Sequence, residues 1–197
     1  MRASTRREFI AGPAGRIECA VDKPDGPVKG VALVAHPHPL FGGTLDNKVV
    51  QTLARAFVEL GYETWRPNFR GVGETDGVHD EGRGELDDLE TVLKSIQTEK
   101  FILAGFSFGA SLAAKLAERA KPEWLVLVGV GLTRIMAPPV PPGTLVIHGE
   151  SDDTVPLAVV MDWARPQELP VVVVPGADHF FHRKLHILRA LVERNAK

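Results

Sequence analysis

A serine between two glycines gives this sequence its clearest chemical signal. Residues 105–109 read G-F-S-F-G, after the apolar stretch 101–104 and before the helix-forming stretch 110–116. Ser107 is therefore expected at a tight turn from a buried strand into a helix, with its hydroxyl exposed above the sheet. The first N–H groups of that helix carry a partial positive charge, which suits a developing oxyanion. The pattern favours a serine nucleophile, and a glycine-rich turn without chemistry is the alternative.

A serine nucleophile needs a base and an acid that orients the base, and both residue types follow downstream. Residues 144–147 form a short apolar run that opens into a loop containing Asp152. A run of valines at 171–174 precedes a loop that contains His179. Loops that follow parallel strands meet at one edge of a sheet, so we expect these side chains to lie near the serine.

The chain resembles the α/β-hydrolase superfamily, in particular its small bacterial serine hydrolases without a large lid domain. The resemblance covers nearly the whole chain and includes the chain order Ser, Asp, His. It rests on five segments, which are residues 34–43, 68–73, 105–109, 148–156 and 176–180. The resemblance implies that Ser107 is the nucleophile and His179 the general base. It also implies that Asp152 holds the imidazole in its reactive tautomer.

Two of these assignments, Asp152 and His179, have rivals of the same residue type. Asp153 directly follows Asp152, but the family pattern H-G-x-x-D-x-x-V-P aligns on Asp152. His182 and His186 lie four residues apart on the expected last helix and are interpreted as surface or helix-flank residues. His148 opens the acidic loop and is interpreted as structural.

Two backbone N–H groups are expected to form an oxyanion hole. Phe108, the residue after the nucleophile, supplies one of them. The resemblance places the other in residues 36–43, where two prolines have no N–H to donate. His38 and Leu40 remain, and alignment with the family favours His38. His36 and His38 also alternate as metal ligands do, but no third ligand has suitable spacing, so neither a metal nor another cofactor is expected.

Alternating strands and helices predict an α/β fold with a doubly wound, mostly parallel eight-stranded sheet and helices on both faces. The expected strands are Glu8–Ile10, Arg16–Val21, Gly30–Ala35, Glu63–Pro67, Phe101–Ala104, Leu125–Val130, Thr144–His148 and Val171–Val174. The expected helices are Asn47–Leu60, Gly84–Thr98, Ser107–Ala120, Leu157–Trp163 and His182–Asn195.

The connection at residues 131–142 is too short for the helical lid that many hydrolases carry, and its prolines make it stiff. Leu132, Ile135 and Met136 either line an acyl pocket or pack on the sheet. The polar, glycine-rich residues 69–82 are expected to form a rim whose charges are solvated. With no lid, an open site suited to small or exposed acyl groups is expected.

Composition is consistent with a single enzyme domain spanning residues 1–197, with 44% hydrophobic and 24% charged residues. The net charge of −2 argues against nucleic acid or an anionic membrane as a partner. The single cysteine, Cys19, excludes an internal disulfide and suits a reducing compartment. Residues 5–10 superficially resemble an export signal, but a short opening β-hairpin explains them better. No apolar run in the sequence reaches the roughly 18 residues that a membrane span needs. A cytoplasmic location is expected.

These features together predict a serine hydrolase that cleaves carboxylic esters of a small-molecule acyl substrate through an acyl-enzyme. A thioesterase, peptidase or lactone hydrolase would use the same three residues, and acyl transfer is a further alternative. A non-catalytic ligand-binding protein on a hydrolase scaffold is the alternative of a different class. The sequence specifies neither the acyl group nor the oligomeric state.

Overall fold

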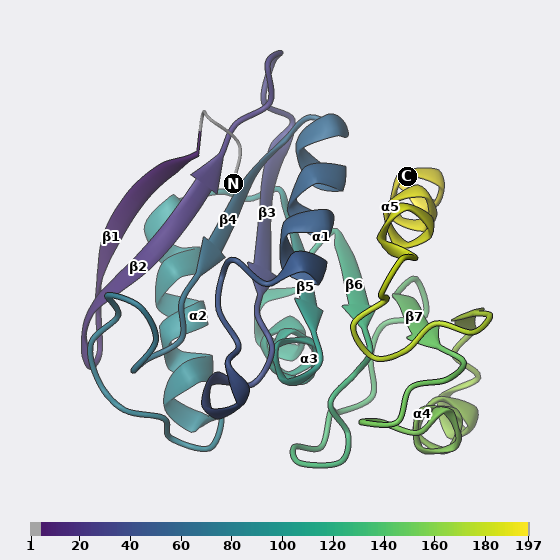
Figure 1. The fold of residues 1–197 in the computed structure, drawn as a ribbon. Helices are drawn as coiled ribbons and strands as arrows, with labels where there is room; N and C mark the ends of the chain where they lie inside the picture. Colours follow the sequence, from purple (N-terminus) through teal and green to yellow (C-terminus); the bar gives the residue numbers. More distant parts are fainter. Residues whose placement is uncertain (1–4, 197) are drawn as a thin grey trace.

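A single eight-stranded sheet runs through the computed structural model, which describes residues 5–196 (Figure 1). Its strands are β1 (Arg6–Gly12), β2 (Gly15–Asp22), β3 (Gly30–Ala35), β4 (Tyr62–Pro67), β5 (Phe101–Phe106), β6 (Trp124–Val128), β7 (Leu145–Gly149) and β8 (Val171–Val174). The helices are α1 (Lys48–Glu59), α2 (Arg83–Ile96), α3 (Phe108–Ala120), α4 (Leu157–Ala164) and α5 (Leu185–Asn195), with short 3-10 helices η1 (Pro39–Phe41) and η2 (Arg165–Gln167).

The strands lie in the order β1-β2-β4-β3-β5-β6-β7-β8. The opening hairpin pairs β1 with β2, and β2 pairs antiparallel with β4. Every other neighbouring pair, from β4 across to β8, is parallel. The predicted fold class and the opening hairpin are therefore confirmed, and the loops after β3, β5, β6, β7 and β8 share one edge of the sheet.

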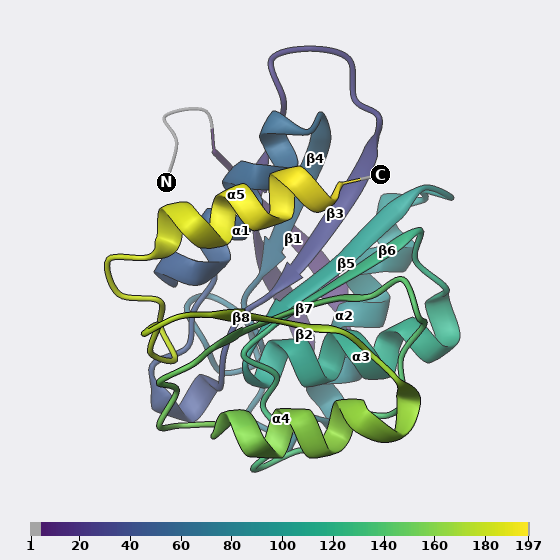
Figure 2. The ribbon, with the colours of Figure 1, turned by 90° about the vertical axis from the view of Figure 1, so that its right-hand side faces the viewer.

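Helices cover both faces of the sheet, as Figure 2 shows. On one face, Leu53 of α1 and Leu188 of α5 belong to the same buried cluster. On the other face, the buried cluster includes Leu89 of α2, Leu116 of α3 and Val160 of α4. Full burial of each such side chain stabilises the fold by about 1.5–3 kcal/mol, so both layers hold the sheet in place.

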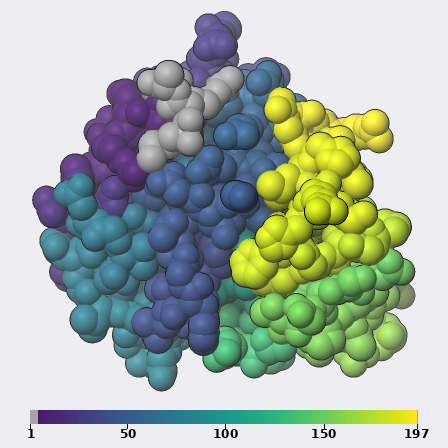
Figure 3. All heavy atoms as spheres, viewed as in Figure 1, coloured from purple at the N-terminus to yellow at the C-terminus, as the bar shows by residue number. Residues whose placement is uncertain are grey.

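Helices α1 and α5 pack side by side although they lie far apart in the sequence (Figure 3). The N-cap of α1 is Asn47, whose side-chain oxygen accepts the N–H groups of Val49 and Val50 at 2.9 and 3.4 Å. Gly61, at φ +94°, follows the helix and ends it as predicted.

Within residues 5–196, none of the helices has the length and apolar character needed to cross a bilayer.

The predicted start of the last helix at His182 is wrong, because α5 begins at Leu185. Phe181 and Arg183 have φ values of +54° and +60°, which right-handed helix does not allow. Phe181 is completely buried in the cluster beneath α1 and α5. The chain therefore turns to insert this ring into the core before the helix can begin.

Candidate active site

Ser107 lies between the end of β5 and the first residue of α3, in a strained backbone conformation. Its φ and ψ are +56° and −120°, a combination that costs about 1–3 kcal/mol for a residue with a side chain. A Cβ atom on Gly105 would lie 2.3 Å from the Gly109 carbonyl oxygen, and one on Gly109 would lie 2.4 Å from that of His36. Both glycines are therefore needed for the strand and helix to approach closely enough to form this turn.

Hydrogen bonds connect Ser107 to His179 and His179 to Asp152. The Ser107 Oγ lies 3.0 Å from His179 Nε2, and His179 Nδ1 lies 2.6 Å from Asp152 Oδ2. The carboxylate can only accept, so Nδ1–H donates to it and Nε2 is left to accept the serine proton. Both His179 and Asp152 are buried. The arrangement can therefore remove a proton from Ser107 and stabilise the imidazolium that results.

Backbone N–H groups fix the orientation of the Asp152 carboxylate. Its Oδ1 accepts the N–H of Thr154 at 3.0 Å and that of Val155 at 2.8 Å, which leaves Oδ2 for His179. Asp153 is exposed and contacts the Thr154 hydroxyl at 3.4 Å. Of the two neighbouring carboxylates, the structure thus brings Asp152 to the imidazole.

The other downstream histidines have different surroundings. His148 is buried, and its Nε2–H donates to the Val155 carbonyl at 2.9 Å. Burial lowers the pKa of His148, so a neutral ring fits this position. His182 is exposed and pairs with Asp178 at 2.6 Å, and His186 is exposed on α5. Within the described chain, the imidazole that bonds Ser107 is that of His179.

The two expected oxyanion donors, Phe108 and His38, belong to the pocket that contains Ser107. Phe108 is the first residue of α3, so its backbone N–H has no partner within the helix. His38 lies in the loop after β3, and both residues line the same pocket as Ser107. The rival N–H of Leu40 donates to the His38 imidazole Nδ1 at 3.3 Å. This bond engages Leu40 and favours His38 as the second donor.

His36 anchors the start of the His38 loop. It is completely buried, its Nδ1–H donates to the Pro37 carbonyl at 2.6 Å, and its Nε2 accepts the Phe69 N–H at 2.9 Å. Both ring nitrogens are thus engaged with backbone groups. In residues 5–196, no three His, Cys, Asp or Glu side chains gather as a metal site would require.

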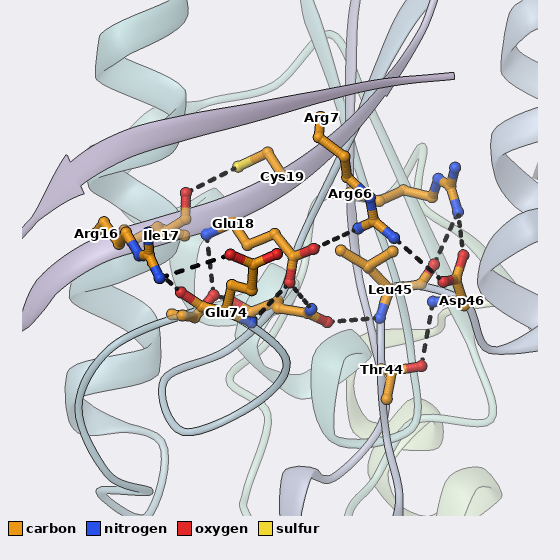
Figure 4. Close-up of polar contacts among 12 residues, drawn as sticks. Arg7, Arg16, Ile17, Glu18, Cys19, Thr44, Leu45, Asp46, Arg66 and Glu74 are labelled. Carbon is orange, nitrogen blue, oxygen red and sulfur yellow. Dashed lines mark hydrogen bonds and ion pairs between the residues drawn. The ribbon is translucent and has the colours of Figure 1, made fainter. Parts of the chain in front are cut away.

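A buried polar network holds the continuation of this loop. Arg66 of β4, which is 1% exposed, donates to the Leu45 carbonyl at 2.8 Å (Figure 4). The Leu45 N–H donates to Asn68 Oδ1 at 2.9 Å, and the Asn68 amide donates to Glu18 of β2 at 2.7 Å. Arg7 of β1 in turn pairs with Glu18 at 2.7 Å (Figure 4). The loop beside the nucleophile is therefore connected to three strands through paired polar groups.

A pocket of about 290 Å³ opens over Ser107. Its lining comes from the loops after five parallel strands and comprises Pro37, His38, Phe41, Gly42, Gly43, Asn47, Ser107, Phe108, Gly131, Thr133, Arg134, Thr154, Val155, His179 and Phe180. Residues of the 69–82 rim do not line it; in that loop, Arg70 pairs with Asp88 of α2 at 2.8 and 2.9 Å.

The connection after β6 contributes residues to the pocket other than its three apolar candidates, Leu132, Ile135 and Met136. Leu132 is buried and Ile135 packs against the same core cluster, which decides between the two predicted roles in favour of packing. Met136 is 69% exposed and lies outside the pocket lining. Thr133 and Arg134 line the pocket instead. These two residues follow a parallel strand, and this position could have indicated that they line the site. The candidates were instead chosen for their hydrophobicity, which favoured the apolar neighbours.

Comparison with known proteins identifies the fold family. Residues 38–143 match the family model of the alpha/beta hydrolase fold. An uncharacterized protein of Rickettsia prowazekii is 34% identical, over 89% of this chain and 82% of the relative. The chain belongs to the α/β-hydrolase fold family.

Two solved structures are similar along nearly their whole length. One, from Xanthomonas campestris and described as an α/β serine hydrolase without lid, has a TM-score of 0.91 and 36% identity, covering 99% of this chain and 94% of that chain. An α/β serine hydrolase homologue from Coxiella burnetii has a TM-score of 0.89 and 40% identity, covering 98% and 97%. The resemblance to lidless bacterial serine hydrolases is confirmed, and it supports hydrolase activity.

Proposed function

We propose that this protein is a serine hydrolase that cleaves carboxylic esters of small acyl groups through an acyl-enzyme. The observation that carries the proposal is the hydrogen-bonded connection from Ser107 through His179 to Asp152, with spacings of 3.0 and 2.6 Å. The cytoplasmic location and the small-molecule substrate stay predictions from the sequence.

In the proposed reaction, Ser107 Oγ attacks the ester carbonyl while His179 Nε2 takes its proton. The tetrahedral oxyanion accepts the N–H groups of Phe108 and His38, and the α3 dipole adds a favourable potential. His179 then protonates the leaving alcohol. Water, activated by the same imidazole, releases the acid and restores Ser107. Asp152 orients the imidazole and stabilises its positive charge throughout.

The pocket supports a short acyl group. Its volume of about 290 Å³ lies near the lower end of the range for small-molecule sites, and several loops rather than a lid form its walls. A carbonyl with a few carbon atoms fits this space, whereas a long acyl chain would extend past the rim into water. We therefore expect short-chain esters to be the better substrates.

Hydrolysis of p-nitrophenyl esters from acetate to decanoate tests the proposal. We expect the highest kcat/KM at a short chain, and Ser107→Ala should lower kcat by at least about a thousandfold because the nucleophile is lost. Ser111→Ala is a matched control, since Ser111 is a buried serine on the next turn of α3 and its hydroxyl has no protein partner in the described chain.

The outcomes separate the alternatives. Equal rates for wild type and Ser107→Ala on every ester would overturn the proposal. Ser107-dependent cleavage of acyl thioesters without cleavage of oxygen esters would keep the nucleophile but replace the substrate class. An optimum at decanoate would contradict the argument from pocket size.

A further inference from the structure

The segment after β6 is anchored on the backbone of the nucleophile. The Gly131 N–H donates to the Ser107 carbonyl at 3.1 Å. A Cβ atom on Gly131 would lie 2.9 Å from the Phe108 nitrogen, so the chain passes directly against the elbow. The N–H groups of Arg134 and Ile135 then point back to the Gly131 carbonyl at 3.5 and 3.4 Å. This turn places Arg134 at the pocket wall.

Arg134 is a cation without an acidic partner in the part of the chain that the structure describes. Its guanidinium lies 4.4 Å from the centre of the Phe41 ring, which also lines the pocket. No ion pair joins Arg134 to an Asp or Glu in residues 5–196, whereas Arg70 makes two hydrogen bonds to Asp88. Arg134 is exposed, so its donors are free to meet a ligand.

The other pocket residues carry no compensating negative charge. The lining contains no Asp or Glu, and Arg134 is its single Lys or Arg within the described chain. Asp152 lies behind His179, where two backbone N–H groups and the imidazole already occupy its oxygens. Burial, followed by the charges of His79 and Arg134, lowers the pKa of His38, which keeps that ring neutral. Among the described residues that line the pocket, Arg134 is therefore the one permanent charge.

We propose that Arg134 binds a carboxylate of the substrate, so that the preferred substrates are esters with a carboxylate a few bonds from the scissile carbonyl. A guanidinium matches a carboxylate in planar geometry and donates two parallel hydrogen bonds to it. Phe41 holds the guanidinium over its ring and restricts its motion, which lowers the entropy lost on binding. This inference rests on the proposed ester hydrolysis and specifies its substrate class.

Two matched substrate pairs test the inference. On the acyl side, p-nitrophenyl hemiglutarate is compared with the neutral p-nitrophenyl valerate. On the leaving-group side, para-acetoxybenzoate is compared with its neutral methyl ester. The measured quantity is the ratio of kcat/KM for the anionic ester to that for its neutral partner, in wild type, Arg134→Gln and Arg134→Lys. Arg55→Gln is the matched control, because Arg55 is exposed on α1 outside the pocket and the same charge is removed.

For at least one pair, we expect the ratio to fall about fivefold in Arg134→Gln, the size of a single solvent-accessible ion pair. It should fall less in Arg134→Lys, stay at the wild-type value in Arg55→Gln, and decrease with added salt in wild type. The pair that responds shows which side of the ester bears the carboxylate.

The inference would be overturned if, for both pairs, the ratio were the same in wild type and Arg134→Gln. This holds even if both rates fell, because an unchanged ratio would mean that Arg134 only supports the pocket wall. Ester turnover with such an unchanged ratio would leave the proposed function intact. Absence of Ser107-dependent turnover on every ester would instead overturn the proposed function, and the substrate assignment with it.

Discussion

Acid should destabilise this fold through His36, the residue that follows β3. Its imidazole is completely buried, and Nε2 accepts the Phe69 N–H at 2.9 Å. Protonation would place an N–H on Nε2 that faces this backbone N–H, and it would bury a charge. Burial accordingly lowers the pKa of His36 from 6.5 to about 3.

The sign and size of the effect follow from this difference in pKa. The unfolded chain binds a proton at His36 below about pH 6.5, while the folded chain does so only near pH 3. The stability from neutral His36 is thus fully present above the unfolded pKa and is lost as the pH falls towards 3. The slope approaches about 1.4 kcal/mol per pH unit, which gives a loss of about 2.5 kcal/mol between about pH 7 and pH 4.5.

Urea unfolding at several pH values measures this loss. Comparison of wild type with His36→Gln isolates the contribution, because glutamine does not titrate and other groups remain. His186→Gln is the control, since this ring is exposed on α5. We expect the free energy of unfolding of wild type to fall about 2.5 kcal/mol more than that of His36→Gln over the same interval, with His186→Gln following wild type. Parallel curves for wild type and His36→Gln would refute the reasoning.

Two further predictions concern the site and the loop beside it. Asp152→Asn should lower kcat by about 10³- to 10⁴-fold, because an amide cannot hold the His179 tautomer as the carboxylate does. Steady-state ester hydrolysis measures this loss, and a decrease of less than about tenfold would contradict the role of Asp152. Asn68→Ala should reduce the free energy of unfolding by about 2–4 kcal/mol, since it leaves the Leu45 N–H and the Glu18 carboxylate without their 2.9 and 2.7 Å bonds. Urea unfolding checks the second prediction, and a change under about 0.5 kcal/mol would show that water replaces the amide.

The sequence predicts the sheet and most of the helices because their signals are local. A valine run such as residues 171–174 favours a strand whatever surrounds it, and the apolar spacing of residues 49–60 defines one face of a helix. Each predicted strand was found, and the chain order of the loops then determines which of them meet at one sheet edge. This is why Ser107, Asp152 and His179 could be named together before their distances were known.

The errors occur where distant contacts decide the local conformation. Nothing in residues 178–184 alone shows that Phe181 is inserted beneath α1 and α5, yet this insertion delays the start of the last helix to Leu185. Distant contacts also explain why the sequence did not single out the pocket residues after β6. Leu132 is buried in the core and Ile135 packs against it, whereas Thr133 and Arg134 of the same turn line the pocket.

The nucleophile and the loop beside it are positioned by one kind of contact, and Arg134, the proposed specificity residue, is positioned by another. Ser107 is held by the close approach of β5 and α3, while the loop beside it is held by the buried side chains of His36, Asn68 and Arg66. These contacts tolerate little change, because a lost partner leaves a buried polar group unpaired. Arg134, by contrast, lies on an exposed turn whose link to the elbow is a backbone hydrogen bond from Gly131, which does not depend on the side chain at position 134. The architecture therefore allows the charge of the pocket to vary while the geometry around the serine is retained.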